Sequence, residues 1–252
     1  MKRLFLFAAL LITSELSAQK ILCYNIHHAN PPSKPGVIDL EAIASVIRKS
    51  EADIVFLQEV DVKTHRSGSV DEAAKLGELT SLHHTFFKAI DHDGGEYGVA
   101  ILSKYELKNP QTIALPLDPA SPGEPRVLGL AEVQLPGKRN VVLACTHLDA
   151  QRGPVSRNLQ AAEIVSRLKG EKRPVILAGD LNDTPESHAL ATILQAGFTS
   201  TCTECPFTIP EKIPTHTIDF ILIRGGKWKV KKHEVVAETY ASDHRPVFAQ
   251  LD

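Results

Sequence analysis

Four short apolar segments of this sequence end in residues that could take part in acid–base, metal-binding or phosphate-binding chemistry. Each segment is rich in Val, Ile or Leu and has the length of a buried strand. The segments and the polar residues that follow them are Ile21–Tyr24 with Asn25, Asp53–Leu57 with Gln58 and Glu59, Val141–Thr146 with His147 and Asp149, and Pro174–Gly179 with Asp180 and Asn182. Because open α/β proteins place their chemistry at strand ends, these residues could meet at one site.

The alternative is that each polar residue caps a helix or a turn. That explanation serves well for any one of them. It does not explain all four strand ends together, because a hydrophobic core does not require carboxylates there and burying an unpaired carboxylate is energetically costly.

Patterns between these segments predict the elements that position them. Apolar residues recur at helical spacing over 40–47 and 155–168, and further helices are expected at 71–82 and 186–196. For the last helix, Thr184 and Pro185 fit an N-cap and a first-turn proline. More strands are expected at 86–90, 97–102, 127–135, 218–223 and 246–251. This order mixes strand–helix–strand units with hairpins, which predicts an α/β fold of mixed sheets covered by helices.

Six short motifs, in this order, resemble the endonuclease/exonuclease/phosphatase superfamily, which includes deoxyribonucleases, abasic-site endonucleases, neutral sphingomyelinases and inositol polyphosphate phosphatases. They are Tyr24–Ile26, Leu57–Asp61, Thr146–Asp149, Gly179–Asp183, Ile218–Phe220 and Ser242–His244. The stretch Gly94–Ser103 resembles exported bacterial members in particular. Each motif alone is weak, but six in the right order are specific, and the resemblance runs from about residue 20 to the C-terminus.

The resemblance implies a four-layer α/β/β/α sandwich of two packed mixed β-sheets flanked by helices, spanning residues 19–252. It also implies a divalent-metal-dependent hydrolase of phosphate esters, with a phosphodiesterase favoured. Glu59 matches the metal-binding glutamate, with Asn25 and Asp243 beside it. Oxygen ligands of this kind suit Mg²⁺ or Mn²⁺.

The resemblance assigns the remaining motif residues to the reaction itself. His244 matches the catalytic histidine, and Asp219 matches the carboxylate that orients it. Asp180 and Asn182 match the pair that positions the attacking water and the phosphoryl oxygens, and His147 matches a donor to the phosphate. Either Asp180 or His244 could be the general base, and the sequence does not choose between them.

Three further residues are candidates for substrate contact. Arg126 and Arg157 could bind phosphate, and Tyr97 could line the site. The alternatives are a solvent-exposed charge for each arginine and a core position for the tyrosine.

The first eighteen residues have the layout of a secretory signal peptide. Lys2 and Arg3 precede an apolar run that is too short to span a bilayer, and Ala18 stands before the expected cleavage point. We therefore expect an exported protein, periplasmic or secreted, without a stable membrane span and acting as a monomer. Cleavage would remove two basic residues and one acidic residue, so the mature chain is slightly more acidic than the whole sequence, whose net charge is −2.

Three substrate classes stay open: a small phosphorylated molecule, a lipid headgroup as in sphingomyelinases, or nucleic acid cut by a secreted nuclease. The lack of net positive charge weakens the nuclease hypothesis without excluding it. A catalytically inactive binding protein of the same fold is a further alternative, disfavoured because every motif residue is present.

The four cysteines divide into two pairs. Cys23 and Cys145 lie in strand-like segments and are expected in the core. Cys202 and Cys205 form an isolated CxxC, for which a local disulfide is a better hypothesis than zinc, because zinc would need two more ligands.

Overall fold

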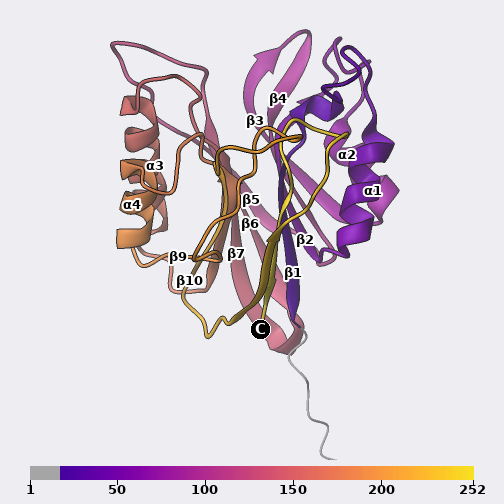
Figure 1. Ribbon diagram of the computed structural model, residues 1–252. Helices are drawn as coiled ribbons and strands as arrows, with labels where there is room; N and C mark the ends of the chain where they lie inside the picture. Colours follow the sequence, from indigo (N-terminus) through magenta and orange to yellow (C-terminus); the bar gives the residue numbers. More distant parts are fainter. Residues whose placement is uncertain (1–17) are drawn as a thin grey trace, which may run out of the picture.

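The protein folds as two six-stranded sheets packed face to face, with a pair of helices over the outer face of each sheet (Figure 1). This computed structural model describes residues 18–252. The predicted signal peptide, residues 1–18, therefore lies outside the described residues except for Ala18. The four-layer α/β/β/α sandwich predicted from the sequence is confirmed.

The first sheet has the strand order β11-β12-β1-β2-β4-β3. Among its described strands, β1 and β2 are the only parallel pair of neighbours. Helices α1 (Leu40–Ser50) and α2 (Glu72–Thr80) cover it. The strands are β1 (Gln19–Asn25), β2 (Ile54–Val62), β3 (His83–His92), β4 (Gly95–Ser103), β11 (Val230–Val235) and β12 (Val247–Leu251).

The second sheet has the order β5-β6-β7-β8-β10-β9 and one parallel pair, β7 with β8. Helices α3 (Val155–Leu168) and α4 (His188–Gln195) cover it. The strands are β5 (Lys108–Ala114), β6 (Val127–Leu135), β7 (Arg139–His147), β8 (Val175–Asp180), β9 (Thr199–Ser200) and β10 (Asp219–Arg224). The part of the chain from residue 18 onward also has two short 3₁₀ segments, η1 (His27–Ala29) and η2 (Pro136–Lys138).

The apolar runs are continuous because the central strands are buried on both faces. In β1, Ile21 and Cys23 pack between the sheets, whereas Leu22 and Tyr24 pack under α1 and α2. This alternation follows from the two-residue period of a strand. The alternation determines the face of the sheet to which each side chain points. It therefore also determines the direction of the polar side chain at the strand end.

The sequence predicted the buried strands better than the edges. Strands β5 and β11 were not predicted, because they are largely exposed, polar edge strands without an apolar run. The cap expected for α4 was wrong. Ser187, not Thr184, is its N-cap, and the Ser187 hydroxyl accepts a hydrogen bond from Leu190 N. Thr184 and Pro185 lie in the preceding loop.

Cys202 and Cys205 form a disulfide, as the local-disulfide hypothesis expected. Cys23 and Cys145 are free thiols buried between the sheets, as predicted. Among the described residues, no helix is both long and apolar enough to cross a membrane.

The closeness of β7 and β8 yields a test of the fold. A Cβ atom added at Gly179 would lie 2.0 Å from the carbonyl oxygen of Thr146 on β7. We expect Gly179→Ala to lower the free energy of unfolding by roughly 1–3 kcal/mol, because the backbone must shift to admit the methyl group.

Denaturant unfolding monitored by circular dichroism measures this change. Gly170→Ala is the matched control, since a Cβ there meets nothing within 4 Å. Equal stability of the two variants would contradict the described packing of β7 against β8.

Candidate functional site

Strand register brings three ionisable residues to one end of the second sheet. Asp180 is the last residue of β8, and it pairs with His147 at the end of β7 and with Asp219 at the start of β10. All three side chains are buried. His244 reaches the same point from the loop before β12, where its Nδ1 lies 2.9 Å from Asp219 Oδ2.

Asp180 is the centre of this cluster. Its Oδ2 lies 3.5 Å from His147 Nε2 and 3.7 Å from His244 Nε2. The same oxygen accepts a hydrogen bond from Asn25 Nδ2 at 3.0 Å, and Oδ1 accepts one from the backbone N–H of Asn182 at 2.8 Å. Four segments of the chain therefore hold one carboxylate.

Burial and neighbouring charge shift the proton affinities of the cluster. Burial, together with the nearby Asp219 carboxylate, raises the pKa of Asp180 to about 7. Burial alone would lower the pKa of His244, but Asp219 and Asp180 favour its charged form and raise the pKa to about 10. Burial, Arg126 and His244 lower the pKa of His147 well below its ordinary value. At neutral pH the site thus combines a charged and a neutral imidazole.

A β-bulge aims Glu59 toward this cluster. The register between β2 and β4 shifts between Leu57 and Val60, and Glu59 has a φ of +56°. Its Oε1 accepts a hydrogen bond from Asn25 Nδ2 at 3.0 Å. Asn25 therefore connects Glu59 on the first sheet with Asp180 on the second sheet.

The donor set at Glu59 fits a divalent cation. Glu59 and Asp243 are half-buried, and no described residue donates a hydrogen bond to Glu59 Oε2. Asp243 is held through Ser242, whose hydroxyl donates to the Asn25 carbonyl oxygen at 2.7 Å. The side chain of Asn25 makes a hydrogen bond that the sequence did not predict, because its Oδ1 accepts a hydrogen bond from His27 N at 3.0 Å. In this arrangement Asn25 positions Glu59, and the open oxygens belong to carboxylates.

Arg126 and Tyr97 lie beside the cluster. The buried Arg126 places Nη1 3.4 Å from His147 Nδ1 and 2.6 Å from Glu124 Oε1. Tyr97 is also buried, its hydroxyl is paired with Arg126, and burial together with Glu59 raises its pKa. Both residues thus adjoin the reaction centre predicted from the sequence.

For Arg157, the solvent-exposed alternative is wrong. It is buried rather than solvent-exposed. Its Nε donates to Asp183 Oδ2 at 3.0 Å, and its Nη1 donates to the backbone carbonyl oxygens of Asp149 and Gln151. These contacts give Arg157 the role of joining the segment after β7 to the segment after β8, which carries Asn182.

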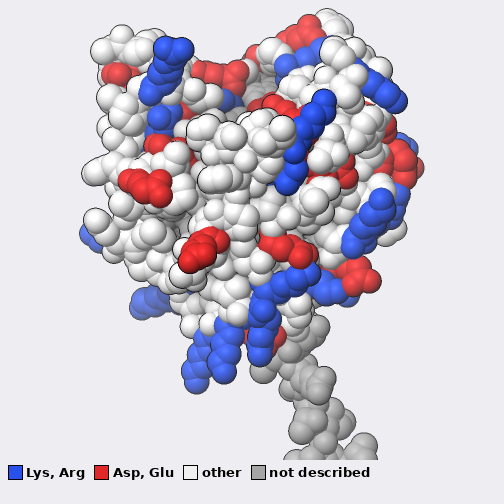
Figure 2. Space-filling model, viewed as in Figure 1, with Lys and Arg blue, Asp and Glu red and all other residues white. Residues whose placement is uncertain are grey.

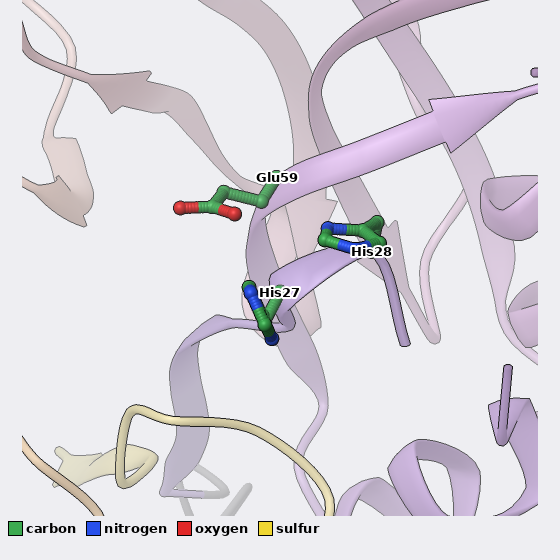
Figure 3. A group of neighbouring side chains, drawn as sticks. All are labelled: His27, His28 and Glu59. Carbon is green, nitrogen blue, oxygen red and sulfur yellow. The ribbon is translucent and has the colours of Figure 1, made fainter. Parts of the chain in front are cut away.

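Sequence reasoning missed two side chains next to Glu59, those of His27 and His28. One ligand atom each from His27, His28 and Glu59 lies within 4.8 Å of the others, with Glu59 from β2 and the histidines from η1 (Figure 3). Burial lowers the pKa of His28 to about 4, with help from Arg66 and His27. Arg66 makes a two-point ion pair with Asp61 at 2.7 and 2.8 Å. The signal that could have found the histidines is their position directly after the first motif.

The site lies at the end of the sandwich where β1 and β8 finish. This end is hollowed between the two layers, and Asp and Glu side chains are visible in the hollow (Figure 2). On the same face, Lys and Arg side chains are visible both around this hollow and at the opposite end of the molecule (Figure 2).

Comparisons with known proteins agree with this fold. Residues 22–244 match the sequence profile of the Endonuclease/Exonuclease/phosphatase family, so the chain belongs to this family. Members of the family are phosphoesterases and typically use a divalent metal, and this chain is accordingly a hydrolase of phosphate esters. A search among curated proteins gave no match.

Similar solved structures include three from different organisms. An endonuclease/exonuclease/phosphatase from Beutenbergia cavernae has a TM-score of 0.78 at 24% identity, covering 93% of this chain and 71% of its own. A mannosyl-6-phosphatase from Bacteroides thetaiotaomicron has a TM-score of 0.76 at 18% identity, covering 93% and 99%. The catalytic domain of human Nocturnin, with a bound sulfate anion, has a TM-score of 0.73 at 20% identity, covering 93% of each chain. At these identities the similarity shows the fold.

The contact between His244 and Asp219 yields a test of the electrostatics. We expect Asp219→Asn to lower the pKa of His244 from about 10 toward or below its ordinary value, because the charged partner that favours the imidazolium is lost while burial remains. NMR titration of the histidine side chains measures this shift.

His65 is the matched reference in the same spectra, because it is a mostly exposed histidine that pairs with Asp93 rather than with Asp219. A His244 pKa that is the same in both proteins would contradict the described pairing.

Proposed function

We propose that this protein is a divalent-metal-dependent phosphodiesterase in which Asp180, His244, His147 and Asn182 act on the phosphoryl group. The observation that carries this proposal is that His147, Asp180 and Asp219, at the ends of β7, β8 and β10, meet His244 from the loop before β12 and are joined through Asn25 to Glu59. A core would not place four such groups together without a function.

Asp180 is the proposed general base. It accepts a proton from the attacking water when its carboxylate is ionised, and its pKa of about 7 matches that role near neutral pH. Asn25 and the Asn182 backbone N–H fix the orientation of the carboxylate. His244 is less suited to accept the proton, because its contacts with Asp219 and Asp180 favour the charged form.

The imidazolium of His244 is instead the proposed donor to a phosphoryl oxygen, with Asp219 holding its ring through Nδ1. His147 is a neutral donor on the other side of Asp180, since its Nε2 faces the same carboxylate oxygen. The side chain of Asn182 is tied to the Leu148 carbonyl oxygen at 2.9 Å, which holds the loop that presents it.

Glu59 and Asp243 are the proposed ligands of Mg²⁺ or Mn²⁺, and Asn25 holds Glu59 in place. When bound, the cation would neutralise charge on the phosphate and on the leaving oxygen.

The charges around the site favour a substrate with a single phosphate group over a nucleic acid. The arginines next to the cluster are already paired with carboxylates, Arg126 with Glu124, Arg66 with Asp61 and Arg157 with Asp183. A neighbouring pocket formed by residues 184–186, 203–207 and 215–217 has no Lys or Arg in its lining. A nuclease would need a basic groove to track the backbone. A small phosphodiester or a lipid headgroup is therefore the proposed substrate.

Two similar structures support phosphate chemistry in this fold. One is named a mannosyl-6-phosphatase, and another holds a sulfate anion. We further propose that the protein is exported and acts as a monomer. The signal-like first eighteen residues, the start of β1 at Gln19 and the Cys202–Cys205 disulfide support export.

A substrate panel on the purified protein tests the proposed function. We expect hydrolysis of phosphodiesters, faster than of phosphomonoesters, that needs Mg²⁺ or Mn²⁺ and stops when a chelator removes the metal. Glu59→Gln should lower the rate at least about a hundredfold, because a metal is expected to stabilise the transition state by several kcal/mol.

Glu106→Gln is the matched control, because the Glu106 side chain is 71% exposed and lies outside the site. Activity that survives chelation, or that Glu59→Gln leaves intact, would remove the metal from the mechanism. Nicking of a plasmid at low salt with Mg²⁺ would replace the small-substrate proposal with the nuclease alternative.

A further inference from the structure

We propose that His27 and His28 complete the metal centre at Glu59 and give it a preference for cations that bind imidazole, such as Zn²⁺ or Co²⁺, over Mg²⁺. This inference rests on the proposed function in one respect, namely that Glu59 is a metal ligand. The two nitrogen ligands, and the selectivity for one cation over another that they imply, go beyond that function.

The first support is geometric. The three ligand atoms lie within 4.8 Å of one another. Around a tetrahedral zinc ion, ligand atoms at about 2.0–2.1 Å from the metal stand roughly 3.3 Å apart. Small side-chain rotations therefore bring the group to coordination distance. Figure 3 shows the Glu59 carboxylate and the two rings close together, from β2 and from η1.

The second support is the hydrogen bonding of each ligand. Nδ1 of His27 lies 2.8 Å from the carbonyl oxygen of Asn30, so Nδ1 carries the proton and the lone pair of Nε2 is left for a metal. Nδ1 of His28 is buried without a hydrogen-bond partner among the described residues. Among the residues that the structure describes, only Asn25 donates a hydrogen bond to the Glu59 carboxylate, at Oε1. Among the described residues, Nε2 of His27, Nδ1 of His28 and Oε2 of Glu59 are thus left for a metal.

The third support is the backbone that presents these side chains. His27, His28 and Ala29 have φ values of +47°, +40° and +51°, and Glu59 has +56°. For residues other than glycine this left-handed conformation costs about 1–2 kcal/mol each. Such strain collects at functional sites, where the surrounding structure holds it in place. The proposed ligand set and the adjacent Ala29 account for four of the twelve described non-glycine residues that have positive φ.

The chemistry of the ligands decides the cation. Two imidazoles and one carboxylate suit zinc and cobalt, whereas Mg²⁺ prefers oxygen ligands and water. Arg66 makes a two-point ion pair with Asp61, which offsets part of its positive charge near His28.

Isothermal titration calorimetry of the full chain without a histidine tag tests the proposal, with Zn²⁺ and Mg²⁺ as separate probes and Co²⁺ absorption as a second readout. His27→Asn and His28→Asn are the variants, because asparagine tolerates positive φ and should keep the turn. We expect each to weaken Zn²⁺ binding at least about tenfold and to change the Co²⁺ ligand-field bands. Mg²⁺ binding should be unchanged.

His83→Asn is the matched control, since His83 is exposed on β3, and it should bind Zn²⁺ like the unmodified protein. Unchanged Zn²⁺ affinity in both η1 variants would overturn the inference. If Glu59→Gln then still lowered Mg²⁺ affinity and activity, the proposed function would stand without it. If Glu59→Gln changed neither, the metal assignment would fail as well.

Discussion

The site depends on one constraint, the register that places Asp180 between His147 and Asp219 on adjacent strands. Asp180 is the last residue of β8, and both neighbours also stand at strand ends. A slip of one residue would turn each side chain to the opposite face of the sheet. Ile176 and Ala178 pack between the sheets and Leu177 packs under the helices, so the fit of these side chains to their two layers holds the register. The hydrophobic core therefore sets the chemistry of the strand ends.

The second sheet cannot complete the site alone. Asn25 on the first sheet donates to Glu59 and Asp180, so one amide links carboxylates from both sheets. Gln58, the neighbour of Glu59, is buried between the sheets, where its Nε2 lies 3.5 Å from Cys145 Sγ on β7. Packing between the sheets thus controls the distance between the proposed metal ligands and the proposed base. The bulge at Glu59 then turns one side chain of β2 out of the core and into the site.

The sequence was sufficient to predict the four central strand ends. A strand that is buried on both faces has a continuous apolar sequence, so the polar residue that ends it is easy to recognise. The same logic missed β5 and β11, which are exposed edges held by pairing alone. It also missed His27 and His28, because a left-handed turn of three non-glycine residues has no local sequence signature. The burial of Arg157 could not be predicted, because its partners, Asp183 and two backbone carbonyls, come together only in the folded chain.

The pH dependence of kcat/KM, measured for the unmodified protein and for Asp180→Asn, tests the central claim most directly. With a base of pKa about 7, the rate should fall as the pH drops below that value, because protonated Asp180 cannot accept a proton from water. Asp180→Asn should lose about 10²–10⁴-fold in rate and lose this acid limb, while Asp91→Asn, on a side chain 87% exposed, should lose neither. An Asp180→Asn protein that keeps both its rate and its acid limb would contradict the account.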